Sequence, residues 1–196
     1  MKHGLLYVFG LIVIGSLGLT PSLAAADAVG PYYATPSWDQ TLPSSTRFIV
    51  LSNFNSEAVL DRETGLVWEK SPSTSPFVWQ TSILAGIFDP AQAHCNNLSK
   101  GNRKGWRLPT AQELASLVDP SPSVAPPTLP SGHPFTNVQS SGYWSASSYE
   151  GELGNSSQIA TWVVDFSNGN VSSVFWNLPT PYHVWCVRGG VGVDAH

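Results

Sequence analysis

The sequence is poor in charged residues and in cysteine. Only 11% of its 196 residues are charged, and 9 Lys and Arg against 13 Asp and Glu give a formal net charge of −4. This excludes a polycation that neutralises a nucleic-acid backbone, so we expect no nucleic-acid partner. Two cysteines, Cys95 and Cys186, are too few for a disulfide-framework miniprotein and lack the clustered spacing of a zinc site. From the residues alone, the two cysteines can form one disulfide or remain as two free thiols.

Motifs of catalysis are absent as well. The chain has no Gly-x-Ser-x-Gly elbow, no His-Glu-x-x-His helix, no P-loop and no dinucleotide fingerprint. Beyond the N-terminal region the histidines are scattered, at His94, His133, His183 and His196. We therefore expect no catalytic residue, no metal ion and no cofactor, and we predict that the protein is not an enzyme.

A long apolar run occurs only near the N-terminus. Lys2 and His3 precede a run from Leu5 to Leu19, and Ala24 to Ala26 supply the small residues of a cleavage site. The run is shorter than the roughly 20 residues that span a bilayer. We predict a signal peptide over residues 1–26, cleaved near Ala26, with an uncleaved anchor as the alternative. The product is then secreted or periplasmic, has no stable membrane insertion, and lies where cysteines can pair.

The remaining chain divides by composition. Residues 27–45 are rich in Pro, Ser, Thr and aromatic residues without strand or helix periodicity, and we expect an extended N-terminal arm. Residues 46–190 carry 7 of the 8 tryptophans and the apolar patterns of one well-filled domain, and residues 191–196 form a tail. Within the domain, residues 119–134 hold six prolines and predict a structureless loop.

Local signals predict a hairpin and two helices in the first half of the domain. Asp61 and Gly65 lie between apolar runs and suit a tight turn, because the carboxylate accepts from following amides and glycine tolerates positive φ. Asp89-Pro90 starts a helix whose spacing places Cys95 on the buried face. Thr110 to Glu113 form a capping box, and a second helix follows it and ends before Pro120.

The second half predicts strands throughout. The sequence Asn168-Gly169 between two apolar runs is a strong hairpin signal. Two short helices followed by an antiparallel β meander of three or four strands define an α+β domain. The expected strands are Tyr143–Ser147, Ile159–Phe166, Val171–Trp176 and His183–Val187.

Four motifs in order carry a resemblance to a known family. They are Asp61-x-x-Thr64-Gly65-Leu66-x-Trp68, Gly105-Trp106-Arg107-Leu108-Pro109-Thr110-x-x-Glu113-Leu114, Tyr143-Trp144-Ser145-Ala146-Ser147 and Trp185-Cys186-Val187-Arg188-Gly189. With these the sequence resembles the Lcl C-terminal domain family, a bacterial family typified by the C-terminal domain of a collagen-like adhesin. The resemblance runs from about Arg47 to Gly190.

The resemblance implies a C-type-lectin-like fold with one disulfide. In that fold a cysteine of the first helix is joined to one in the last strand, and Cys95 and Cys186 occupy those places. The adhesin domain is associated with sulfated glycans. The sequence lacks the Glu-Pro-Asn, Gln-Pro-Asp and Trp-Asn-Asp triplets with which calcium-dependent lectins bind sugar.

One cluster of cations is the candidate ligand site. Lys100, Arg103, Lys104 and Arg107 lie within eight residues, and such a cluster binds sulfates or carboxylates of an acidic glycan by charge-assisted hydrogen bonds. The alternative is a solvated loop in which Arg107 has a packing role.

Tryptophans near loops add candidates for stacking on sugar rings. We predict Lys100, Arg103, Lys104 and Trp176 as glycan-binding residues. Trp38 and Trp79 are further candidates for an exposed indole, whereas strand patterns predict core roles for Trp68, Trp144, Trp162 and Trp185.

The resulting functional hypothesis is a secreted or periplasmic, non-enzymatic binding module that recognises a glycan or an envelope or surface protein. The first alternative is a structural subunit of a surface assembly that docks through its N-terminal arm. An enzyme with an unrecognised site is the second alternative.

Overall fold

The structure is a computed structural model that describes residues 42–79, 90–121, 123–153, 156–175 and 180–189, with the backbone alone over 149–153 and 156–159. The predicted signal peptide, most of the predicted arm, the tail, Asp89, Trp38 and Trp176 lie outside the described residues.

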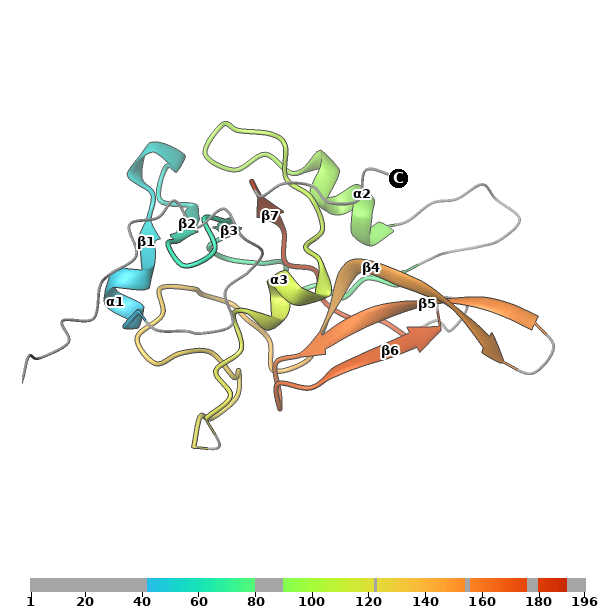
Figure 1. The fold of residues 1–196 in the computed structure, drawn as a ribbon. Coiled ribbons are helices and arrows are strands. Elements are labelled where there is room, and N and C mark those ends of the chain that lie inside the picture. Colours follow the sequence, from blue (N-terminus) through green and yellow to red (C-terminus); the bar gives the residue numbers. More distant parts are fainter. Residues whose placement is uncertain (1–41, 80–89, 122, 154–155, 176–179, 190–196) are drawn as a thin grey trace, which may run out of the picture. The chain divides into compact units, whose positions relative to one another are not determined.

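The described chain is an α+β domain with short helices and two antiparallel sheets (Figure 1). In the described part no helix has the length and apolar character needed to cross a membrane. The elements are α1 (Ser44–Arg47), β1 (Phe48–Val50), the 3-10 helix η1 (Ser52–Phe54), β2 (Ala58–Asp61), β3 (Val67–Glu69), α2 (Pro90–Asn97), α3 (Ala111–Ala115), β4 (Gly142–Leu153), β5 (Ser156–Asp165), β6 (Val171–Phe175) and β7 (Val187–Arg188).

The first sheet has the strand order β1-β2-β3-β7. Its predicted hairpin turn is confirmed: the Asp61 carboxylate accepts from the amide of Glu63 at 3.0 Å, and Gly65 has φ +70°. β7 pairs with β3, placing Trp68 opposite Val187. Of the three or four strands expected in the meander, the segment His183–Val187 is therefore not one, and its last residue lies in β7 of the first sheet. The chain returns to the first sheet because β3 offers an unpaired edge to the last strand.

The second sheet is a three-stranded meander in the order β4-β5-β6. The predicted Asn-Gly turn joins β5 to β6, with Gly169 at φ +78° and the Asp165 carboxylate accepting from the amide of Ser167 at 2.8 Å. The register of β4 against β5 shifts between Trp144 and Ser148. The meander is confirmed, with three strands.

The three-stranded sheet contributes to two apolar cores because successive residues of a strand point to opposite faces. Tyr143 and Val164 belong to the first core, together with Leu114 of α3. The neighbouring Trp144 and Val163 belong to the second core, together with residues of α2 and both cysteines. Figure 1 shows α3 beside β4 and β5.

The proline-rich segment attaches to the first core. Leu129 is 2% exposed, and the amide of Thr128 donates to the carbonyl of Phe166 at 2.8 Å. The amide of Asp119 donates to the carbonyl of Thr128 at 2.9 Å. The described residues of the segment form no helix or strand, as expected for a loop, but the hydrogen bond to Phe166 and the burial of Leu129 attach it to the core.

The disulfide between Cys95 and Cys186 joins α2 to the residue before β7. The two Cα atoms are 5.4 Å apart, the cysteines are 91 residues apart in sequence, and both are fully buried. The pairing implied by the resemblance is thus confirmed. Closing a loop of this length restricts the unfolded chain and stabilises the fold by roughly 4 to 5 kcal/mol.

We expect Cys186→Ser to lower the free energy of unfolding by about 4 kcal/mol, because the unfolded chain regains its loop entropy. Denaturant unfolding measures the change. Cys95→Ser should cause the same loss, and the double variant should lose little more than either single variant. A thiol titration under denaturing, non-reducing conditions that finds two free thiols in the wild type would contradict the pairing.

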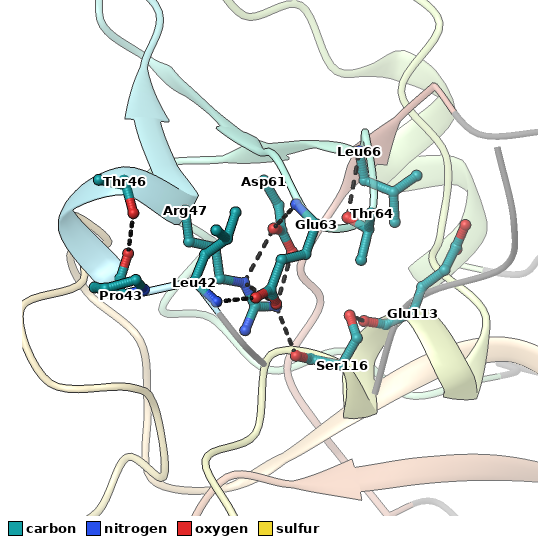
Figure 2. A network of polar contacts seen from close by, with 10 residues as sticks. All are labelled: Leu42, Pro43, Thr46, Arg47, Asp61, Glu63, Thr64, Leu66, Glu113 and Ser116. Carbon is teal, nitrogen blue, oxygen red and sulfur yellow. Dashed lines mark hydrogen bonds and ion pairs between the residues drawn. The ribbon is translucent and has the colours of Figure 1, made fainter. Parts of the chain in front are cut away.

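A buried polar network joins three parts of the first half of the domain (Figure 2). Arg47 is 1% exposed, and its guanidinium donates to the carboxylate of Asp61 at 2.8 and 3.0 Å. The same group lies 3.1 Å from Glu63 and donates to the carbonyl of Ser116 at 2.8 Å. Glu63 also accepts from the amide of Leu42 at 2.6 Å. The network links the end of α1, the β2–β3 turn and the end of α3.

Arg47→Met should lower the free energy of unfolding by about 3 to 5 kcal/mol, because Asp61 and Glu63 then stay buried without a cation. Arg62→Met is the matched control. Arg62 is exposed and makes one long hydrogen bond to the carbonyl of Thr46, at 3.3 Å, so its loss should change stability by less than about 0.5 kcal/mol. Equal midpoints for the two variants in denaturant unfolding would refute the structural role of Arg47.

Candidate functional site

The predicted basic loop forms a tight turn that packs on the segment before β2. Lys100 and Arg103 exchange backbone hydrogen bonds of 3.2 and 3.0 Å. The amide of Gly101 donates to the Glu57 carboxylate at 2.7 Å. Gly101 has φ +55°, and a Cβ there would collide with the backbone of Phe54. A glycine is therefore required for the turn to lie this close.

The turn presents two exposed cations beside an arginine from β7. The guanidinium of Arg103 lies 4.6 Å from the ring centre of Phe54, and that of Arg188 lies 5.8 Å from the same centre. Arg188 also donates from Nε to the carbonyl of Lys104 at 2.9 Å. We call Lys100, Arg103, Lys104 and Arg188 the basic patch. Among the described side chains, no carboxylate lies within 4.0 Å of the charged nitrogens of Arg103, Lys104 or Arg188.

Lys100 differs from the other members because it is ion-paired. Its Nζ lies 3.4 Å from Oε1 of Glu69, a residue of β3 whose side chain is 3% exposed. Burial raises the pKa of Glu69 to about 7, although the charge of Lys100 lowers it. At neutral pH the charge of Lys100 is thus compensated by a carboxylate that is close to its own titration point.

Arg107 has a packing role. Its guanidinium donates to both carboxylate oxygens of Glu113, at 2.7 and 2.6 Å, and to the carbonyl of Gly189 at 2.8 Å. Glu113 also accepts from the amide of Thr110 at 2.8 Å, and the Thr110 hydroxyl accepts from the amide of Glu113 at 3.2 Å. The predicted capping box is confirmed, and Arg107 reinforces it. Its charge is paired, so it lies outside the basic patch.

The tryptophans that the structure describes divide between the core and half-buried positions. The predicted core role is confirmed for Trp68, Trp144 and Trp185, which are fully buried, and wrong for Trp162, which is half-buried. Trp162 lines a shallow hollow beside α3. Trp79 is half-buried against Trp144, with ring centres 5.5 Å apart, so it is not a freely exposed platform.

The histidines of the described residues differ from the basic patch in their charge. Burial lowers the pKa of His94, His133 and His183, so each favours the neutral form. In the described ranges, no group of three or more His, Cys, Asp or Glu side chains is placed to hold a metal ion.

Sequence reasoning missed Arg188 as a member of the patch. Its position in the motif Trp185–Gly189 marked it as part of the domain but did not reveal its neighbours. β7 pairs with β3, and this places Arg188 beside the turn. The candidate site is thus built from segments about 85 residues apart.

These observations define a disulfide-linked α+β domain with a basic patch in which Arg103 and Lys104 are exposed. The sequence matches the Lcl C-terminal domain family over residues 57–188, and the chain belongs to this family. The matched range ends at Arg188 and contains the whole basic patch. No curated protein and no solved structure matches the chain.

Proposed function

We propose that this protein is a non-enzymatic binding module that recognises an acidic glycan through the basic patch. The observation that carries the proposal is the convergence of Arg103, Lys104 and Arg188, three cations without a carboxylate partner among the described residues, on an acidic chain. Sulfate and carboxylate groups accept charge-assisted hydrogen bonds from such cations. Planar guanidinium groups suit these anions particularly well because two N–H groups can bind one anion.

The arrangement of the patch favours binding because two of its arginines are held in place. Arg103 and Arg188 both contact the ring of Phe54, and Arg188 is tied to the backbone of the turn. A guanidinium held before binding loses less rotamer freedom when an anion arrives. Gly101 fixes the turn itself against the same segment.

The family supports the same conclusion from a second direction. The chain belongs to a family typified by the C-terminal domain of an adhesin, and that resemblance implies a surface role. A C-type-lectin-like fold is part of the proposal. It is supported by the disulfide from α2 to the residue before β7 and by the return of β7 to the first sheet.

Secretion or a periplasmic location belongs to the proposal too. The apolar N-terminal run followed by small residues supports export. A buried disulfide is stable in an oxidising compartment, where an acidic glycan of a cell surface is accessible.

Chromatography on heparin tests the proposal, with single substitutions to keep the fold intact. Arg103→Gln, Lys104→Gln and Arg188→Gln should each weaken binding by up to about fivefold, as expected for the loss of an exposed ionic contact. The combined variant should lose retention at physiological salt. Retention of the wild type should fall steeply with rising salt, because exposed charges are screened over about 8 Å.

Arg62→Gln is the matched control for these variants. It removes one exposed cation outside the patch and should elute within the range of the wild type. Lys100 stays unchanged in this series, because its removal would leave Glu69 buried without a cation. Equal retention of the wild type and the combined variant would refute the acidic-glycan function. Self-association of the purified protein without glycan retention would favour the surface-assembly alternative.

A further inference from the structure

We propose that Glu69 makes the basic patch pH-sensitive. Protonation of its buried carboxylate leaves the charge of Lys100 uncompensated and strengthens anion binding. The inference rests on the proposed function, because it concerns the regulation of the same patch. It follows from the position of one carboxylate behind the turn that carries the patch.

Glu69 is held where its charge acts on Lys100. Its backbone amide donates to the carbonyl of Cys186 at 3.0 Å, and its carbonyl accepts from the indole of Trp185 at 2.7 Å. The side chain is 3% exposed, so water solvates its charge poorly. Lys100 is its ion-pair partner at 3.4 Å, and Oε2 has no hydrogen-bond partner among the described residues. Lys100 and a hydrogen bond with the Cys186 backbone stabilise this buried charge, but they do not offset the effect of burial.

The other groups near Glu69 favour its neutral form or do not compete with it. Glu57, which precedes β2, adds a second negative charge and raises the pKa of Glu69. Burial raises the pKa of Tyr143, on β4, to about 12, so the phenol stays neutral. Burial, with a smaller effect of Lys100, lowers the pKa of His94 on α2. The raised pKa of about 7 thus places the charge change of Glu69 around neutral pH.

The direction of the effect follows from the raised pKa of about 7. Above pH 7 the carboxylate is charged and compensates Lys100. Below pH 7 it is neutral, and Lys100 adds its full charge to Arg103, Lys104 and Arg188. The same shift stabilises the fold at low pH: this contribution is complete below the ordinary value of 4.5 and is lost as the pH rises through about 7.

The first test measures heparin affinity at constant ionic strength, at about pH 6 and about pH 8, where sulfates keep their charge. Wild-type affinity should be about three- to fivefold higher at the lower pH, the size expected for one partly screened charge. Glu69→Gln, a neutral side chain of the same shape, should bind equally at both values and as tightly as the wild type at low pH. An unchanged pH dependence in Glu69→Gln would assign the effect to histidines and overturn the proposal.

Two further results separate the proposal from the function on which it rests. Wild-type binding that is equal at both pH values would overturn the role of Glu69 and leave the glycan function intact. If the wild type binds heparin at neither pH, both the role of Glu69 and the glycan function are overturned. Carbon-13 NMR of the Glu69 carboxyl in ligand-free wild type needs no variant: a midpoint near 7 supports the switch, and one near 4.5 refutes it.

Discussion

The disulfide between Cys95 and Cys186 is the constraint on which the basic patch depends. Cys95 lies in α2, five residues before Lys100, and Cys186 lies two residues before Arg188. The bond therefore fixes the start of the basic turn against the strand that supplies the fourth cation. The pairing of β7 with β3 also fixes the position of Arg188. Glu69, the last residue of β3, lies within ion-pair distance of Lys100.

Several charges of the described residues are paired inside the domain and are not available to a ligand. Arg47 is held by Asp61 and Glu63, and Arg107 is held by Glu113. The desolvation of a buried ion pair can cancel its Coulombic gain, but removal of one partner leaves a costly unpaired charge. The charges of these two arginines are therefore used within the fold and are not available to a ligand. Arg103, Lys104 and Arg188 have no carboxylate partner among the described side chains, and this distinguishes them from Arg47 and Arg107.

The elements that could be predicted are those with a local cause. The turn at Asp61 and Gly65, the capping box at Thr110 and the Asn168-Gly169 hairpin each depend on contacts within a few residues, and all three are present. The burial of Leu129 and the return of β7 depend on remote partners. Neither proline content nor β propensity carries information about such partners, so local patterns predicted neither feature.

The sequence by itself determined the local backbone, the burial of Cys95 on its helix and the clustering of Lys100, Arg103 and Lys104. The tertiary structure alone decided which cations are available, because the partner of a charge is set by distance in space. It paired Lys100 with Glu69, committed Arg107 to Glu113 and added Arg188 to the patch. The Coulomb interaction and its screening depend on the distance between two charges and on their burial. Spacing along the chain determines neither this distance nor the burial.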